Sequence, residues 1–473
     1  MRRFALLLAL LPLAGCTGDN PPPAASVVNP VPYVVDHPVV TGARMLLSYW
    51  EQLGPDGALE ARAMTRASVC PLIVSFKDYE AKQRTDMPMT MRAPATGEFP
   101  MICVGPVPTD ANTVWIAATK EEGDGYQFTM EHVSRSAALI PYDHTGQLAQ
   151  FRRDPERILV IGDTGCRLKG SLVQPCNDPK QWPFRQIARK AADLKPDLVI
   201  HVGDYLYREN ACPADNDGCQ GTPFGDNWPT WDADFFSPGW PLLAAAPWVF
   251  VRGNHEDCQR AGPGWTRLLA PAPFDPANIC ADHAPPFTVP LKAMNLVVMD
   301  NASAPDTAVD ASMVPAYREE LTALGNSQMP VWALMHRPIW AAISGPLGLP
   351  VGGNATEIEA AGKNGIPKPV ELLIAGHIHT FEAINYKDKV PPQILAGGGG
   401  DLLDKTPLDL AGTIFQGSSG VSVKDGLSIN GFSYLLMSKV PEGWVIQVFD
   451  QDGVAIRRCM FAGGRVDCPA PKT

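Results

Sequence analysis

The chain has 473 residues and a formal net charge of -11, and hydrophobic residues make up 45% of it. This length exceeds that of one compact domain, so we expect one large domain and a smaller one. An acidic chain repels phosphate backbones, which excludes nucleic-acid binding driven by bulk charge.

The first 15 residues predict a signal peptide. Arg2 and Arg3 precede an apolar run that ends at Leu13 and is too short to span a bilayer. The following Ala14-Gly15-Cys16 completes a pattern that resembles a bacterial lipobox, so we expect Cys16 to be lipidated after cleavage. An ordinary signal peptide with an incidental cysteine is the alternative.

The predicted location is therefore outside the cytoplasm, with the protein held by its lipid anchor. Thr17, rather than an aspartate, follows Cys16 and favours the periplasmic face of the outer membrane. Residues 16–40 include three consecutive prolines and predict an extended linker.

Residues 41–150 predict a small β-rich N-terminal domain. Residues 70–76 and 112–118 are apolar runs typical of strands, and we expect a helix near residues 43–53. No motif with recognisable chemistry falls in this region.

Residues 155–465 predict a layered α/β (α+β) domain. A helix is expected over residues 184–194, because apolar residues recur there at helical spacing. Residues 432–437 and 444–449 predict a β-hairpin. Short apolar runs predict strands at residues 158–161, 198–202, 248–251, 296–299, 331–334 and 372–375. Such an alternation predicts two sheets packed face to face and flanked by helices.

Ten of the eleven cysteines remain once Cys16 is set aside. In an exported chain an even number predicts disulfides, and a zinc–cysteine site is less favoured because its usual CxxC spacings are absent. Pairing by proximity in sequence predicts five bridges, namely Cys70–Cys103, Cys166–Cys176, Cys212–Cys219, Cys258–Cys280 and Cys459–Cys468.

Polar side chains follow five of the predicted strands directly. The sequences at these strand ends are GDTG (162–165), GDYLY (203–207), GNHE (253–256), ALMH (333–336) and GHIH (376–379). Because sites in α/β sheets lie at the carboxyl ends of strands, we expect the clusters to meet at one rim. The glycines before Asp163, Asp204, Asn254 and His377 are expected to let the backbone turn sharply there.

The residue types in these clusters predict a two-metal site. Carboxylate, amide, phenolate and imidazole together suit iron, zinc or manganese, and a carboxylate such as Asp204 can bridge two cations. His377 and His379 lie on one side of an extended chain, so each can reach a different ion. Taken singly, each signal is weak; His201, inside a predicted strand, is interpreted as a structural residue.

The five motifs in this order resemble the metallophosphoesterase (calcineurin-like) superfamily, and within it the purple acid phosphatases. The resemblance covers residues 155–400 and implies that family's two-sheet sandwich fold. Ala333 stands where the fourth motif usually has valine. Gly165 stands where many members have a metal-binding histidine, and Tyr207 is the feature that points to the purple acid phosphatases.

The resemblance also implies which residues bind metal. One ion, expected to be Fe(III), would be held by Asp163, Asp204, Tyr207 and His379. The second, which would be iron, zinc or manganese, would be held by Asp204, Asn254, His336 and His377.

The implied activity is acid-phosphatase-like hydrolysis of small phosphate monoesters by a metal-bound hydroxide. His255 is the expected catalytic residue, binding phosphoryl oxygens or protonating the leaving group. Animal-type members have a further histidine near the position of Ser344. Its absence leaves leaving-group protonation to His255, to a distant residue such as His283, or to water, and favours aryl over alkyl esters.

Two other functions remain open on the sequence alone. A phosphodiesterase of the same superfamily would use the same metals with a different pocket. A non-catalytic, metal-binding surface lipoprotein would retain the fold without turnover, although all seven predicted ligands are present.

Overall fold

The computed structural model describes residues 46–78, 83–111, 113–117, 145–344, 350–351, 353–362, 365–387, 390–415 and 420–469. The predicted signal peptide, Cys16 and the linker lie outside these residues. Among the helices of the described part, none is long and apolar enough to cross a bilayer.

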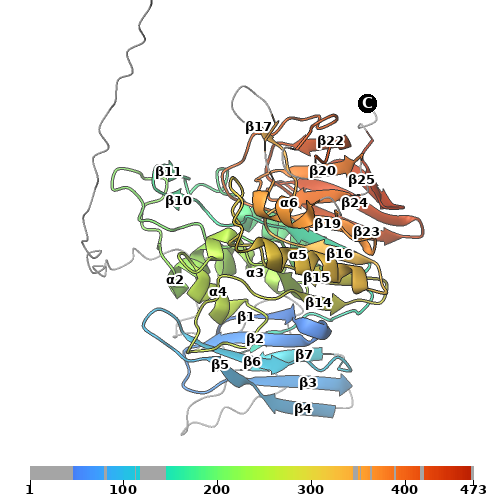
Figure 1. The fold of residues 1–473 in the computed structure, drawn as a ribbon. Coiled ribbons are helices and arrows are strands. Elements are labelled where there is room, and N and C mark those ends of the chain that lie inside the picture. The colour runs from blue at the N-terminus through green and yellow to red at the C-terminus, as the bar shows by residue number, and fades with distance from the viewer. Residues whose placement is uncertain are drawn as a thin grey trace, which may run out of the picture.

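Two large sheets form the centre of the molecule (Figure 1). The first has eleven strands in the order β26 (Arg465–Asp467), β25 (Ala455–Ala462), β24 (Gly443–Asp450), β23 (Ser433–Val440), β9 (Arg157–Ile161), β12 (Leu198–His201), β13 (Trp248–Phe250), β1 (Leu46–Leu53), β2 (Leu59–Thr65), β6 (Met101–Pro106) and β5 (Thr90–Ala93). The second has seven, in the order β14 (Phe287–Pro290), β15 (Asn295–Val298), β16 (Val331–Leu334), β19 (Val370–Ala375), β21 (Gln393–Ala396), β20 (Phe381–Tyr386) and β22 (Val423–Ile429).

Smaller elements complete the fold. A four-stranded sheet has the order β4 (Gln83–Pro88), β3 (Leu72–Asp78), β7 (Thr113–Ala117) and β8 (Thr145–Gln147), and two short hairpins pair β10 (Leu168–Lys169) with β11 (Leu172–Val173) and β17 (Ile343–Ser344) with β18 (Pro350–Val351). The helices are α1 (Phe184–Asp193), α2 (Trp228–Trp231), α3 (Ser237–Leu243), α4 (Gly262–Leu268), α5 (Val314–Ala323) and α6 (Ala355–Ala361). Short helical turns are η1 (Pro55–Gly57), η3 (Asp232–Phe236), η4 (Asn254–Glu256) and η5 (Leu324–Asn326).

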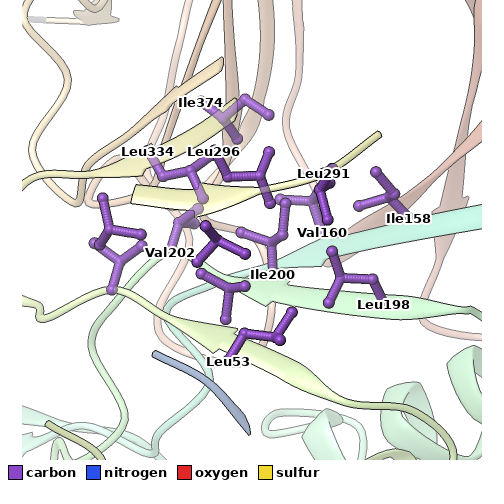
Figure 2. Close-up of a cluster of buried hydrophobic side chains, with 14 of the residues drawn as sticks. Leu53, Ile158, Val160, Leu198, Ile200, Val202, Leu291, Leu296, Leu334 and Ile374 are labelled. Atoms are coloured by element: carbon purple, nitrogen blue, oxygen red, sulfur yellow. The ribbon is translucent and has the colours of Figure 1, made fainter. Parts of the chain in front are cut away.

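The predicted two-sheet architecture is confirmed. Parallel strands β9, β12 and β13 of the first sheet face β15, β16 and β19 of the second across a core of branched aliphatic side chains (Figure 2). In Figure 2, Val160 and Ile200 lie opposite Leu296, Leu334 and Ile374. Burial of each such side chain contributes about 1.5–3 kcal/mol, which explains why these strands read as unbroken apolar runs.

Helices cover the outer faces of both sheets. On the first sheet, Leu159 and Val199 pack in one cluster with Phe184 and Ile187 of α1. On the second, Leu373 belongs to a cluster with residues of α5 and α6. The order of layers is therefore helix, sheet, sheet, helix, and both central sheets are buried on two faces.

The expectation of a helix over residues 43–53 is wrong. Residues 46–53 form strand β1, which pairs parallel with β13 and antiparallel with β2. Nearly every side chain of β1 is buried, including Glu51 and Gln52. A strand buried on both faces has no alternation of polar and apolar residues, so periodicity could not identify it.

The pairing of β1 with β13 makes the N-terminal strands part of the large sheet. Strands β1, β2, β6 and β5 continue the sheet that contains β9, β12 and β13, whereas β3, β4, β7 and β8 form their own sheet. The β-rich character predicted for this region is confirmed, and a domain boundary near residue 150 stays a prediction.

The N-terminal strands also hold the C-terminal end of helix α4, whose last carbonyls lack helical partners. Gln52 donates to Leu269 O (3.2 Å), and the buried guanidinium of Arg62 donates to Leu268 O and to Ala270 O (2.7 Å). Arg92 adds bonds to the carbonyls of residues 266, 267, 270 and 272. Helix α4 follows the GNHE turn, so this contact ties the N-terminal region to that turn.

Substitution of Arg62 by methionine is expected to lower the free energy of unfolding by roughly 3 kcal/mol, because two buried carbonyls lose a charged donor. Urea unfolding measures the loss. Arg66→Met, at an exposed position just beyond β2, is the control. Equal losses in the two variants would contradict the role assigned to Arg62.

Glu51 gives the protein a pH-dependent stability. Its carboxyl is buried without a hydrogen-bond partner, and burial raises its pKa to about 8. At a pH below the pKa that Glu51 has in the unfolded chain, its carboxyl is protonated in both the folded and the unfolded state. Between that value and about 8 only the unfolded state releases the proton, so stability falls as pH rises through this window.

The variant Glu51→Gln should remove this loss. The difference in unfolding free energy between Glu51→Gln and the wild type is expected to increase from pH 5 to pH 8, by on the order of 3 kcal/mol, because only the wild type loses stability over this range. Denaturant midpoints at the two pH values measure it. Glu371→Gln, at an exposed position of β19, should show no such trend. A gain that does not change with pH would contradict the raised pKa.

Candidate metal centre

The carboxyl ends of five strands bring the seven predicted ligands to one rim. Strands β9, β12 and β13 lead into Asp163, into Asp204 and Tyr207, and into Asn254, while β16 and β19 of the facing sheet lead into His336 and into His377 and His379. Six of the seven are buried, and His377 is partly exposed. The structure therefore gathers all seven residues, from segments more than 200 positions apart.

The first cluster is centred on the phenol of Tyr207. Its Oη lies 3.0 Å from Asp163 Oδ1, 2.9 Å from Asp204 Oδ2 and 3.1 Å from His379 Nε2. Four potential ligand atoms thus converge around one point, and three of them are oxygens of acidic side chains.

The second cluster is centred on His336. Its Nε2 lies 3.0 Å from Asn254 Oδ1 and 3.1 Å from Asp204 Oδ2. Ligand atoms of Asp204, His336 and His377 all lie within 4.8 Å of one another. Because Asp204 Oδ2 belongs to both clusters, this oxygen is placed to bridge two cations.

Each histidine has one ring nitrogen held outside the clusters. His336 Nδ1 is 2.8 Å from Val202 O, His379 Nδ1 is 2.6 Å from Leu402 O, and His377 Nε2 is 2.9 Å from Asp306 Oδ2. Metal-binding histidines commonly donate their second nitrogen to a carbonyl or carboxylate, which fixes the tautomer and the ring orientation. The other nitrogen of each ring is then free to bind a cation.

The charges of the first cluster fit a cation. Burial, together with Asp163 and Asp204, raises the pKa of Tyr207 well above its ordinary value. Burial also opposes ionisation of Asp204, but the neighbouring His336 and His255 hold the pKa of that carboxyl well below its usual range. A phenolate ligand here therefore requires the additional positive charge that a metal ion supplies.

Three of the ligand residues have strained backbone. Asp163 (φ 57°), Asp204 (φ 59°) and His377 (φ 69°) adopt the left-handed conformation, which costs roughly 1–2 kcal/mol for a residue with a side chain. Such strain persists where the surrounding structure enforces it, and it gathers at functional sites.

The expected role of the four preceding glycines needs correction. Of these four, only Gly203 has a positive φ, at +101°. The others are required for space: a Cβ on Gly253 would lie 2.1 Å from Asp204 N, and one on Gly376 would lie 2.6 Å from Asp163 Oδ2. The left-handed φ angles fall on the predicted ligands Asp163, Asp204 and His377, and the glycines leave room for two loops to approach.

Glu256, the last residue of GNHE, organises two ligand loops. Its carboxyl oxygens accept backbone N–H groups from Asp204 (3.1 Å), Tyr205 (2.8 Å), Leu206 (3.1 Å) and Gly253 (3.1 Å), while burial and the charge of Asp204 raise the pKa of Glu256 to about 8. One buried side chain thus determines the positions of the loops that carry Asp204 and Asn254.

His255 lies beside both clusters. Its ring centroid is 3.9 Å from that of Tyr207, its Nε2 is 4.0 Å from Asp204 Oδ2, and its Nδ1 is 2.7 Å from Glu209 Oε1. Burial raises the pKa of Glu209, but the close approach of His255 and the nearby Arg260 and Lys169 lower it more strongly, so the pKa of Glu209 lies below its usual value. Sequence reasoning missed Glu209, because no motif spacing marks it.

Two arginines near the site were also missed. Arg167 pairs with the buried Asp401 and lies over the Tyr207 ring, 4.8 Å from its centroid. Arg337 pairs with Asp306 and has Nη1 3.4 Å from His377 Nε2. Both arginines follow a ligand motif in sequence, but their acidic partners come from distant loops, which only the fold brings near.

The other singled-out residues have structural surroundings. His201 is a buried core residue, as interpreted: its Nε2 is 3.0 Å from Thr164 Oγ1 and its ring stacks on Tyr205. His283 Nε2 is 2.6 Å from Glu320 Oε1. Ser344 lies exposed in β17.

The five predicted disulfide pairings are confirmed, with Cα–Cα distances between 4.1 and 5.7 Å. Three of them brace loops around the site. Cys166–Cys176 follows GDTG, Cys212–Cys219 follows GDYLY, and Cys258–Cys280 follows GNHE.

Comparison with known proteins agrees with this geometry. Residues 156–381 match the sequence family described as calcineurin-like phosphoesterase. Among solved structures, purple acid phosphatase PPD1 from yellow lupin (Lupinus luteus) is similar, with a TM-score of 0.56, 12% identity, and coverage of 88% of this chain and 74% of that one. PhoD is also similar, with a TM-score of 0.53, 10% identity, and coverage of 92% and 94%.

At these identities the structural neighbours establish a shared fold and no more. No curated protein sequence matches the chain significantly. The family match and the strand-end clusters nevertheless coincide, since all five motifs lie between residues 156 and 381. This part of the chain is a calcineurin-like metallophosphoesterase domain.

Proposed function

We propose that the protein is a dinuclear-metal phosphomonoesterase of the purple acid phosphatase type. The observation that carries the proposal is the convergence of Asp163, Asp204 and His379 on the Tyr207 hydroxyl, within 3.1 Å. A phenolate among carboxylate and imidazole ligands suits a trivalent iron ion.

The ligands divide into two sets that share Asp204. Asp163, Asp204, Tyr207 and His379 would hold Fe(III), and Asp204, Asn254, His336 and His377 would hold a second ion of iron, zinc or manganese. When bound, the two cations act as Lewis acids and lower the pKa of water, which supplies a nucleophile at mildly acidic pH.

His255 is the proposed catalytic side chain. The ring lies against Tyr207 and presents Nε2 toward Asp204 while Nδ1 is held by Glu209. Burial lowers the pKa of His255, while Asp204 and Glu209 favour the doubly protonated ring, from which Nε2 would donate a proton to a phosphoryl oxygen or to the leaving alcohol. Glu209 is thus a positioning residue, itself placed by Lys169 (3.3 Å) and Arg260 (3.9 Å).

Arg337 and Arg167 border the site but are already paired with Asp306 and Asp401. Their side chains therefore orient His377 and Tyr207 more than they attract free anions. The main positive charge for a phosphate must come from the metal ions, as the acidic composition of the chain requires.

We also propose that the protein is exported and lipid-anchored through Cys16. Five disulfides support an oxidising compartment, because such bonds are rare in the cytosol. Labelling with a radioactive fatty acid tests the anchor, with Cys16→Ala as the unlabelled control.

Tyr207→Phe tests the metal assignment. The purified wild-type protein is expected to be pink or purple with about two metals per chain, and the variant to lose the colour because the phenolate is gone. Visible spectra and elemental analysis measure both. Tyr205→Phe, whose hydroxyl bonds to Val251 O, is the matched control and should keep the colour.

The other outcomes of this experiment are equally informative. A colourless wild type that holds two zinc or manganese ions would remove the iron assignment and leave a phosphoesterase. A protein that binds no metal after reconstitution would contradict the enzymatic proposal. Turnover of diesters above monoesters by the loaded protein would change the class to phosphodiesterase.

Glu209→Gln tests the role of His255. The amide no longer holds the ring as a carboxylate does, so kcat for an aryl phosphate is expected to fall by roughly 10–100-fold with metal content unchanged. Asp257→Asn is the control, since Asp257 also pairs with Arg260 but not with His255. Equal kcat in all three proteins would exclude a positioning role for Glu209.

A further inference from the structure

Asn301, which lies just beyond the end of β15, holds the backbone of a predicted metal ligand. Its side chain is completely buried. Its Oδ1 accepts the backbone N–H groups of His336 (3.2 Å) and Arg337 (3.0 Å), and its Nδ2 donates to Arg337 O (2.7 Å). One amide therefore fixes the main chain at two consecutive residues, the first of which is the predicted ligand.

Helix α6 determines the orientation of this amide. The Nδ2 group of Asn301 also donates to Oε2 of Glu357 (2.8 Å), a completely buried residue in the first turn of α6. Burial raises the pKa of Glu357 to about 8, so the carboxyl is uncharged at neutral pH. Turning the amide over would set Nδ2 against two N–H donors and Oδ1 against two acceptors, so the contacts of Asn301 permit one orientation.

The same turn of α6 is connected to a second predicted ligand. Asn354, the N-cap of α6, accepts the N–H of Glu357 through Oδ1 (2.9 Å) and donates through Nδ2 to Asp306 Oδ1 (3.2 Å). The other oxygen of Asp306 lies 2.9 Å from His377 Nε2. Both histidines of the second metal position, His336 and His377, are thus linked to one helix start by buried or partly buried hydrogen bonds.

The histidine of the first metal position is supported by a different segment. The backbone N–H of His379 donates to Asp404 Oδ2 (2.9 Å), and its Nδ1 lies 2.6 Å from Leu402 O. Both partners belong to the loop that follows the glycine-rich turn at residues 397–400. Because the two positions have separate supports, a change at Asn301 should act on the second position and leave the first intact.

We propose that Asn301, oriented by Glu357, is the positioning residue that sets the affinity of the second metal position. The inference rests on the proposed function, because it requires two metal positions. Without the amide, the main chain at His336 gains freedom that must be lost again when the ring binds an ion. This entropic cost lowers the affinity, as removal of groups that orient a metal ligand generally does.

Metal titration of the full chain tests the proposal without an activity assay. Chelator-treated protein is dialysed against graded concentrations of free Zn²⁺, and elemental analysis counts the zinc bound and any iron retained. Tyr207→Phe and His336→Leu identify which binding step belongs to the first and which to the second position. Asn301→Ala is expected to weaken the second position roughly 10–100-fold and to leave the affinity of the first unchanged.

Two substitutions of Glu357 test its part in orienting Asn301. Glu357→Leu removes the acceptor for Asn301 Nδ2 and should weaken the second position in the same direction. Glu357→Gln, an uncharged side chain of similar shape that keeps an acceptor oxygen, should bind both ions as the wild type does. The matched control is Asn295→Ala, at the opposite end of β15, where Nδ2 donates to Ser327 Oγ (3.2 Å). Circular dichroism verifies that each variant is folded.

An unchanged second position in folded Asn301→Ala, or equal weakening of both positions, would overturn the proposal while leaving the proposed function intact. If Asn301→Ala does not fold, the comparison of Glu357→Leu with Glu357→Gln decides the question, and equal affinities in these two variants would overturn the proposal. A wild-type chain that binds no zinc at either position would instead mark failure of the proposed function, and with it of this inference.

Discussion

The close approach of the two central sheets at Gly203 and His336 is the constraint on which the site depends. His336 Nδ1, from the second sheet, lies 2.8 Å from Val202 O of the first. A Cβ on Gly203 would lie 2.4 Å from the same nitrogen, so only glycine permits the contact. The aliphatic core between the sheets supplies the free energy that keeps them this close. Predicted ligands from both sheets thereby meet around Asp204.

Buried carboxylates then hold the loops in place by accepting backbone N–H groups. Glu256 binds the loops after β12 and β13, and Asp234 accepts from Cys166 N (2.8 Å), Tyr207 N (2.7 Å) and Arg208 Nε (2.8 Å). Burial raises the pKa of both carboxyl groups, and a buried acceptor is costly unless its lone pairs are satisfied; here the backbone N–H groups of the strained loops satisfy them. The strain at Asp204 is thus offset by the hydrogen bond from its backbone N–H to Glu256.

The N-terminal region supports the site although none of the predicted ligands belongs to it. Its strands extend the first sheet, and Gln52, Arg62 and Arg92 hold the carbonyls at the end of α4. Helix α4 and the Cys258–Cys280 bridge hold the chain that follows Asn254 and His255.

The sequence by itself determined the six central parallel strands, the residues that meet at their carboxyl ends and the disulfide pairs. Parallel central strands are short and largely apolar, and polar motifs follow them at once, so position along the chain predicts position at the rim. Cysteines close in sequence pair with each other because their loops are short. These features depend on residues close together in the chain, so the sequence of each segment is enough to predict them.

The tertiary structure decided the remainder. Strand β1 could not be identified from periodicity, because pairing with β13 and burial on both faces removed its polar face. Three acidic residues contact the site from separate loops: Glu209 contacts His255, Asp306 contacts His377 and Asp401 contacts Arg167. No spacing in the sequence predicts these contacts. The strained φ angles of Asp163, Asp204 and His377 occur where glycines leave room for two loops to approach closely, which no local pattern shows. Contacts between distant segments depend on how the sheets pack, and that packing is a property of the whole chain.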